Sequence, residues 1–282
     1  MPSSIILSHA QVEPILRARR ENQTFAVVSP DLGLSTLQVA ISSEGVLFPD
    51  GRQLDWKIID QIASSENKCF VIQEQKVSEI KLFSDYTNRV YSLYPTMGAP
   101  TMLISGIPMH RIKNTDPHQD TLQKIKAITP IVGRVLDTAT GLGYTAIEAA
   151  KFAEQVVTIE LDPVALEIAR LNPWSQALFG NPKIRQIVGD SFDELKELDS
   201  SSFSRIIHDP PAFSLAGDLY SETFYRELFR VLRERGRLFH YIGDPESKSG
   251  HNITVGVVRR LRQAGFTRVF PEPKAFGVVA IK

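Results

Sequence analysis

The sequence predicts an α/β protein, with a Rossmann-like, doubly wound and mostly parallel sheet that ends in an antiparallel strand, preceded by a smaller N-terminal α+β domain. Two observations lead to this prediction. From residue 116 onward, apolar runs typical of strands alternate regularly with amphipathic runs typical of helices. Before residue 96, short strand-like runs and two helical patterns follow one another without such alternation. The chain has 282 residues, which is long enough for two unequal domains.

Residues 1–95 are expected to form the α+β domain, with a role in substrate selection. Apolar residues recur at helical spacing over 9–20 and 54–65, and Ser or Asp stands near each start as a cap. Strand-like runs bounded by turn residues lie at 25–29, 37–42, 45–49, 68–73, 79–84 and 89–95. Residues 96–115 are rich in Gly, Pro, Ser and Thr, and predict a connector that folds over the active site.

Residues 116–282 are expected to form the doubly wound domain. Strands joined by helices need right-handed crossovers, so they form an open parallel sheet with helices on both faces. The last two strands have only a short link and should therefore pair antiparallel. The expected order is helix 120–128, strand 134–138, helix 145–153, strand 155–162, helix 163–171, strand 183–190, helix 191–198, strand 203–210, helix 221–235, strand 236–244, helix 253–265, strand 266–272 and strand 276–282.

Composition narrows the function classes. Lys plus Arg and Asp plus Glu are both 32, so the formal net charge is zero, which argues against a protein that coats nucleic acid. The N-terminus does not read as a signal peptide, and no run of about 20 apolar residues predicts a membrane span. Cys69 is the single cysteine, so no intrachain disulfide forms, and we expect a cytoplasmic protein. The histidine spacing predicts no metal site.

A glycine-broken turn follows the first strand of the predicted sheet, in the stretch "DTATGLGYTA" from Asp137. Ligands of open α/β sheets bind at the carboxyl ends of the strands, beside this first turn. Gly141 and Gly143 let the backbone approach a ligand, and the helix that follows points free N–H groups at it. A glycine turn alone is weak evidence, but acids also close the next two strands, Glu160 in "VVTIELDP" and Asp190 in "IVGDSFD". Three acids at three successive strand ends predict a nucleoside-containing ligand.

This order of motifs, with "IIHDPPAF" at the fourth strand, resembles the class I S-adenosylmethionine-dependent methyltransferases over residues 116–282. Within them, "DTATGLGYTAIEA" is similar to a subgroup of predicted methyltransferases. The resemblance implies S-adenosylmethionine as cofactor, with Asp137 and the glycines around its methionine part, Glu160 on its ribose and Asp190 at its adenine. One departure is Ala139, where a glycine is usual. The expected cofactor-binding residues in the region of this resemblance are Asp137, Ala139, Gly141, Gly143, Tyr144, Glu160, Leu161, Asp190, Ser191 and Phe192; Arg111, discussed below, is added from its place in the connector.

The stretch "HDPPAF", residues 208–213, predicts the place of the chemistry. It resembles the acceptor-binding loop of amine methyltransferases, which implies that Asp209 and the Pro210 carbonyl are catalytic and hold the target atom. Pro211 and Phe213 would contact the substrate, although the aromatic stands one place later than usual. The chain has no cysteine near this loop, which disfavours methylation of pyrimidine carbon-5 and leaves a nitrogen or oxygen acceptor.

His110 and Arg111 of the connector are the remaining candidates. A histidine there could act as a base, and an arginine could meet the cofactor carboxylate. Aminopropyl transfer to a polyamine is an alternative that uses the same sheet, and a non-catalytic cofactor-binding partner subunit is another. The sequence leaves open a small-molecule, protein or specific RNA acceptor, and the oligomeric state.

Overall fold

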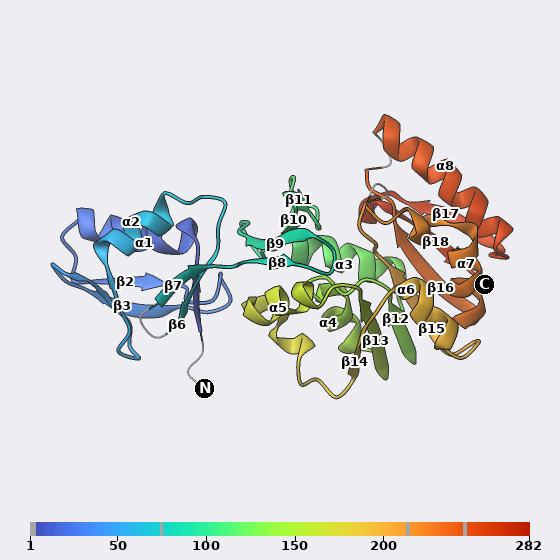
Figure 1. Cartoon of the computed structure of the whole chain (residues 1–282), viewed down its shortest axis with the longest axis horizontal. Coiled ribbons are helices and arrows are strands. Elements are labelled where there is room, and N and C mark those ends of the chain that lie inside the picture. The colour runs from blue at the N-terminus through green and yellow to red at the C-terminus, as the bar shows by residue number, and fades with distance from the viewer. Residues whose placement is uncertain (1–3, 74–75, 213–214, 245–246) are drawn as a thin grey trace. The chain divides into compact units, whose positions relative to one another are not determined.

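The computed structural model of the chain describes residues 4–73, 76–212, 215–244 and 247–282 (Figure 1). The chain forms two compact units. The first comprises residues 1–117 and 164–176, and the second comprises residues 118–163 and 177–282. Each unit has its own hydrophobic core.

Up to residue 117, the described part of the first unit contains three small sheets and two helices, α1 (His9–Arg20) and α2 (Trp56–Ala63). All strand pairs in these sheets are antiparallel. One sheet has the order β1-β6-β7, from β1 (Ile5–Leu7), β6 (Phe70–Gln73) and β7 (Lys76–Glu79). The second has the order β2-β3-β4-β5, from β2 (Phe25–Val28), β3 (Leu37–Ile41), β4 (Gly45–Leu47) and β5 (Gln53–Asp55). The third has the order β11-β10-β9-β8, from β8 (Lys81–Ser84), β9 (Arg89–Tyr94), β10 (Thr101–Ile104) and β11 (Ile107–Pro108).

Helices α1 and α2 begin at the predicted capping residues. The Ser8 hydroxyl accepts a hydrogen bond from the Ala10 N–H, and the Gln11 side chain accepts one from the Ser8 N–H. This reciprocal pair is a capping box, which satisfies backbone donors that the first helical turn leaves free. At α2, the Asp55 carboxylate accepts from the Ile58 N–H at 2.8 Å. The predicted helix over residues 9–20 is therefore confirmed residue for residue.

The second unit is built on a seven-stranded sheet of order β14-β13-β12-β15-β16-β18-β17. The first five strands in this list are parallel, and the last strand of the chain, β18, is antiparallel to both of its neighbours, β16 and β17, which confirms the predicted fold class. The strands are β12 (Arg134–Asp137), β13 (Gln155–Glu160), β14 (Ile184–Val188), β15 (Phe203–His208), β16 (Leu232–Tyr241), β17 (Arg268–Glu272) and β18 (Gly277–Ile281).

Helices connect these strands. They are α3 (Pro117–Ala127), α4 (Tyr144–Ala150), α5 (Pro163–Leu171), α6 (Ser191–Glu194), α7 (Glu222–Val231), α8 (Lys248–Gln263) and the 3₁₀ turns η1 (Pro173–Leu178), η2 (Leu195–Glu197), η3 (Gly217–Tyr220) and η4 (Pro273–Ala275). Nearly all of α5 groups with the first unit in the division above. No helix within the described ranges is both long and apolar enough to cross a membrane.

The helix predicted over residues 221–235 is wrong at its C-terminal end. Helix α7 stops at Val231, and β16 begins at Leu232. The sequence "LRER" has good helix formers, but Leu232 is fully buried and pairs with Phe203 of β15. Tertiary pairing of one apolar residue therefore outweighs the local helix preference of the charged residues that follow it.

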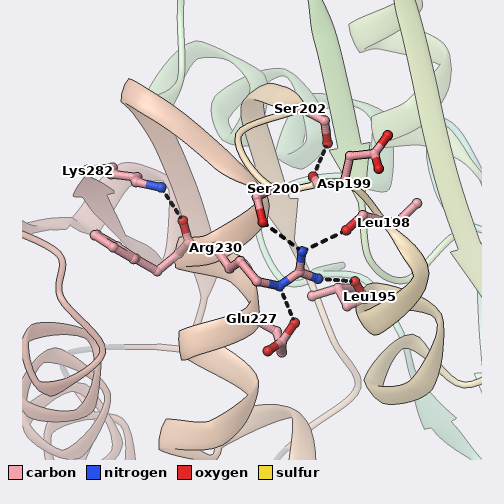
Figure 2. Close-up of polar contacts among 9 residues, drawn as sticks. Leu195, Leu198, Asp199, Ser200, Ser202, Glu227, Arg230 and Lys282 are labelled. Atoms are coloured by element: carbon pink, nitrogen blue, oxygen red, sulfur yellow. Dashed lines mark hydrogen bonds and ion pairs between the residues drawn. The ribbon is translucent and has the colours of Figure 1, made fainter.

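Arg230, in the last turn of α7, fixes this helix to the loop that precedes β15 (Figure 2). Its Nε donates to the Glu227 carboxylate at 2.7 Å, and its Nη2 donates to the Leu195 carbonyl at 2.6 Å. Its Nη1 donates to the Leu198 carbonyl at 2.7 Å and to the Ser200 hydroxyl at 3.2 Å. One guanidinium thereby binds carbonyls at the first residue of η2 and just after its last residue, and it links α7 to the segment that leads into β15.

Several short strands were missing from the sequence predictions. β1 and β5 have three residues each, and β10 and β11 form a hairpin inside the segment expected to be a connector. That segment contributes two strands to the sheet that β8 and β9 complete. Strands this short have too few residues to show a periodic pattern, and β1 also depends on β6, which lies far away in the sequence.

Candidate active site

Four carboxylates stand at the carboxyl ends of four neighbouring parallel strands in the second unit. Asp137 ends β12, Glu160 ends β13, Asp190 follows β14 and Asp209 follows β15. Because these strands are adjacent in the order β14-β13-β12-β15, their carboxyl ends meet at one edge of the sheet. This edge is where ligands bind in open α/β sheets, so the structure brings these predicted site residues to one place.

Asp137 is fully buried beneath the glycine turn. Its Oδ2 accepts hydrogen bonds from the Thr145 hydroxyl at 2.8 Å and the Thr158 hydroxyl at 3.3 Å. Its Oδ1 is buried and has no hydrogen-bond partner in the described part of the chain. Burial raises the pKa of Asp137 to about 7; the two hydroxyls oppose this rise, and the charge of Asp209 adds to it. An orphaned buried carboxylate oxygen indicates a position for a ligand donor.

The glycine turn has the left-handed backbone that its sequence predicts. Gly141 has φ +52° and Gly143 has φ +78°, and the Gly143 N–H donates to the Thr140 carbonyl at 2.7 Å. A side chain at Gly141 would meet no atom within 4 Å, so the space beside this residue is open. A Cβ at Gly143 would lie 2.7 Å from Leu178 Cδ2, so this glycine packs against the protein.

We expect Gly143→Ala to destabilise the protein more than Gly141→Ala. Both changes place an alanine in the left-handed region, which costs about 1 to 2 kcal/mol. Only Gly143→Ala adds a steric overlap with Leu178, so its total cost should reach about 2 to 4 kcal/mol. Chemical denaturation of both variants and the parent measures the difference. Equal free energies of unfolding for the two variants would contradict the packing role of Gly143.

Glu160 is held by backbone donors at the end of β13. Its Oε2 accepts from the Gly141 N–H at 2.8 Å, and its Oε1 accepts from the Asp162 N–H at 3.1 Å. Burial raises the pKa of Glu160 to about 7, and these backbone bonds oppose the rise. A carboxylate has about four lone-pair sites, so Glu160 can still accept two further donors, such as a pair of hydroxyls.

The residues expected around an adenine lie beside β14. Asp190 is exposed and caps α6, with its Oδ1 accepting from the Phe192 N–H at 2.8 Å. The Ser191 hydroxyl is buried and donates to the Thr138 carbonyl at 2.6 Å. Phe192 stacks on Phe224 with ring centroids 6.0 Å apart. Leu161 is 41% exposed at the end of β13, so it offers an apolar surface to a ring.

Asp209 forms an ion pair that the sequence did not predict. Its Oδ2 lies 2.6 Å from Nζ of Lys124, which is 1% exposed and also lies 2.9 Å from an oxygen of Asp120. The ammonium also stands 4.5 Å from the ring centroid of Tyr241. Burial alone would lower the pKa of Lys124, but the charges of Asp209 and Asp120 outweigh burial and raise it. Burial raises the pKa of Asp209, and Lys124 opposes that rise.

The loop that follows β15, here called the proline loop (Asp209–Pro211), has several hydrogen-bond acceptors, and two of them are bound by other residues of the protein. The Pro211 carbonyl accepts from the Tyr220 hydroxyl at 3.1 Å, and Asp209 Oδ2 accepts from Lys124. Within the described residues, neither Asp209 Oδ1 nor the Pro210 carbonyl has a hydrogen-bond donor. Phe213, expected to contact the substrate, lies outside the described residues. Two neighbouring acceptors are therefore left for a ligand.

His208 forms hydrogen bonds both to Thr138, after β12, and to Leu219, in η3. Its Nε2 lies 2.9 Å from the Leu219 carbonyl, which only accepts, so Nε2 carries the hydrogen. Its Nδ1 then accepts from the Thr138 hydroxyl at 2.7 Å. Burial lowers the pKa of His208 to about 3, so the ring is neutral. A neutral histidine with both nitrogens engaged positions the loops and is not free to act as a base.

His110 and Arg111 belong to the first unit. The His110 Nδ1 lies 2.9 Å from the hydroxyl of buried Thr101, and His110 and Arg111 are themselves half-buried. Their participation in the site at the sheet edge stays a prediction.

Lys124 is a candidate functional residue that the sequence analysis missed, although the sequence of α3 contains a pattern that points to it. In α3 the buried positions include Asp120, Thr121, Lys124 and Ile125, and Ile128 just after the helix is also buried. Charged residues in phase with apolar residues on one helix face are unusual, since a charge on the core side needs a partner. That pattern in "DTLQKIKAI" could have indicated a buried ion pair, although not its partner Asp209.

The chain is similar to methyltransferases and to polyamine aminopropyltransferases. The chain matches the family described as methyltransferase domain over residues 136–240. It is 47% identical over 238 residues to the uncharacterized protein MJ1233 of Methanocaldococcus jannaschii, covering 83% of this chain and 80% of that protein. It is 31% identical over 144 residues to polyamine aminopropyltransferase 2 of Streptomyces coelicolor, which covers 48% of this chain and only 26% of that protein. The crystal structure of spermidine synthase from Thermotoga maritima covers 74% of this chain and 75% of its own, with a TM-score of 0.57 and 18% identity, which is a likeness of fold.

Proposed function

We propose that this chain, which belongs to the family of its methanogen relative MJ1233 and to the class I S-adenosylmethionine-dependent methyltransferases, transfers a methyl group to a nitrogen or oxygen acceptor held by its proline loop. When bound, S-adenosylmethionine supplies a methyl group on a sulfonium; the acceptor lone pair takes it, the C–S electrons stay on sulfur, and the acceptor releases a proton. Such a reaction needs alignment more than a nucleophile, and alignment is worth about 7 kcal/mol or more in favourable cases.

The observation that carries this proposal is the pair of acceptors left at the proline loop. Lys124 occupies Asp209 Oδ2 and Tyr220 occupies the Pro211 carbonyl, whereas Asp209 Oδ1 and the Pro210 carbonyl have no donor within the described residues. An N–H or O–H group of an acceptor would satisfy them. The dihedral φ of each proline is fixed by its ring, so the loop is held before the acceptor arrives.

The residues at the strand ends fit the cofactor. Asp137 Oδ1 is buried and lacks a donor among the described residues, which suits the ammonium of the methionine part. The side of Gly141 is open, and Glu160 retains lone pairs for the two ribose hydroxyls. The exposed carboxylate of Asp190 and the exposed Leu161 suit an adenine. These four assignments are part of the proposal.

Aminopropyl transfer is the second candidate, because relatives over half of the chain are named polyamine aminopropyltransferases. Such an enzyme uses decarboxylated S-adenosylmethionine and a polyamine with several positive charges. The Asp209 carboxylate already has an ammonium of the protein at 2.6 Å, so it offers less to a second cation than an unpaired acid would. We therefore place methyl transfer first.

One experiment separates these candidates. The purified protein is incubated with cell extract and either S-adenosylmethionine labelled on its methyl group or decarboxylated S-adenosylmethionine labelled on its aminopropyl group. We expect label to enter the extract only from the methyl donor. Calorimetry should also show that S-adenosylmethionine binds more tightly than decarboxylated S-adenosylmethionine. Transfer from the decarboxylated donor alone would replace the methyltransferase proposal, and binding without either transfer would favour a non-catalytic partner subunit.

A further inference from the structure

We infer that Lys124 is a positioning residue that holds Asp209 as a carboxylate with one oxygen directed to the acceptor, and that this arrangement selects an amine nitrogen over a hydroxyl. The inference rests on the proposed function for its choice of acceptor. The contact between the two side chains stands independently, with Lys124 Nζ 2.6 Å from Asp209 Oδ2.

The position of Lys124 is fixed from several sides. It lies on α3, is 1% exposed, and contacts Asp120 one helical turn earlier at 2.9 Å. The ring of Tyr241 from β16 lies beside its ammonium at 4.5 Å. A side chain enclosed in this way has little freedom to move toward solvent, which holds its charge beside Asp209. Lys126 on the same helix is exposed and forms no ion pair within the described residues, so it provides a matched comparison.

The consequence for Asp209 is electrostatic and geometric. Burial favours the protonated carboxyl, which would donate a hydrogen bond and could not accept one with the same oxygen. The ammonium of Lys124, 2.6 Å from Oδ2, opposes the rise in the pKa of Asp209 that burial causes, and so favours the ionised carboxylate. It also takes Oδ2, so that Oδ1 is the oxygen without a donor among the described residues. The titratable groups around Asp209 are Asp120 and Lys124 of α3, Asp137 of β12, Tyr220 of η3 and Tyr241 of β16.

This environment decides between the two acceptor atoms. A hydroxyl is a poor nucleophile until a base removes its proton, and the ammonium of Lys124, 2.6 Å from Asp209 Oδ2, weakens Asp209 as a base. His208 cannot replace it, because Thr138 and the Leu219 carbonyl occupy both ring nitrogens. An amine that has lost its proton to water already carries a free lone pair. It needs only an acceptor for its N–H, which Asp209 Oδ1 supplies, so the acceptor class is a primary or secondary amine.

The test compares Lys124→Met, Lys124→Arg and the control Lys126→Met. In each protein, the carboxyl of Asp209 is titrated by ¹³C NMR, with Asp209→Asn used for assignment. We expect Lys124→Met to raise the titration midpoint of Asp209 by about 1 to 3 pH units, Lys124→Arg to restore most of it, and Lys126→Met to change nothing. This measurement needs no acceptor, so it stands even if the proposed function fails. An unchanged midpoint in Lys124→Met would overturn the positioning role.

The acceptor class is tested with the methyl-labelled extract. We expect the labelled product to resist alkaline hydrolysis and to behave as an N-methylamine on cation exchange. We also expect Lys124→Met to lower the rate at pH 7 by at least about tenfold and to shift the acidic limb of the pH profile upward. If Lys124→Met does not fold, Lys124→Arg and Lys124→Gln give the same comparison. Labelled methyl ethers or esters would overturn the amine assignment, and an unaltered pH profile would overturn the role of Lys124 in turnover.

Discussion

Asp209→Ala is expected to abolish measurable methyl transfer while leaving cofactor binding nearly unchanged. The variant loses the acceptor for the target N–H, and misplacement of the reacting atom by about 1 Å is enough to cost on the order of 10²-fold. Loss of the whole contact should lower kcat/KM by about 10² to 10³-fold. Radiometric turnover and calorimetry with S-adenosylhomocysteine measure the two quantities separately.

The control for this prediction must account for the ion pair. Asp209→Ala removes one of the two carboxylates beside buried Lys124, which should lower the free energy of unfolding by about 3 kcal/mol. Asp209→Asn keeps an oxygen for Lys124 and should lose turnover only moderately. Asp218→Ala, at an exposed position after the same loop, should change neither quantity. If Asp209→Ala turned over normally while folded, or lost cofactor binding to the same extent as turnover, the proline loop would not be the acceptor site.

Much of the fold could be predicted because the second unit repeats a strong local pattern. In β12, β13 and β15 nearly every residue is buried, and such apolar runs are visible without knowledge of their partners. The antiparallel closing pair follows from the shortness of the link between β17 and β18. The start of β16 could not be predicted, because it depends on Leu232 meeting Phe203, which lies far away in the sequence.

The candidate site was predictable where it depends on position along the chain. An acid that ends a strand lies at the carboxyl edge of the sheet, so Asp137 and Glu160 could be placed from sequence alone. Contacts across elements could not be placed. Lys124 precedes Asp209 by a large part of the domain, and only the packing of α3 on the sheet brings their charges together. The same holds for Tyr220, which engages the Pro211 carbonyl from the turn η3.

Glu160→Ala is expected to cost about 2 to 4 kcal/mol of cofactor affinity, since two charge-assisted hydrogen bonds to the ribose would be lost. Calorimetry with S-adenosylhomocysteine measures this loss. Glu154→Ala, at an exposed position at the other end of β13, is the matched control and should bind normally. Unchanged affinity in Glu160→Ala would exclude Glu160 from the ribose site.

The pH dependence of binding tests Glu160 more sharply. Burial raises the pKa of Glu160 to about 7 in the free protein, so at pH 6 only about a tenth of the molecules carry the ionised form that accepts both hydroxyls. The raised pKa also means that its contribution to folding stability is largest below about pH 4 and is lost as pH rises to 7. Cofactor affinity has the opposite pH dependence and should be about tenfold tighter at pH 8 than at pH 6.

Asp137, whose pKa is also about 7, adds its own pH dependence of cofactor affinity between pH 6 and pH 8. Glu160→Gln should therefore remove the part of the pH dependence of cofactor affinity that is due to Glu160. Asp137→Asn should remove the part that is due to Asp137. A Glu160→Gln profile as steep as that of the parent would show that Glu160 does not change ionisation when the cofactor binds.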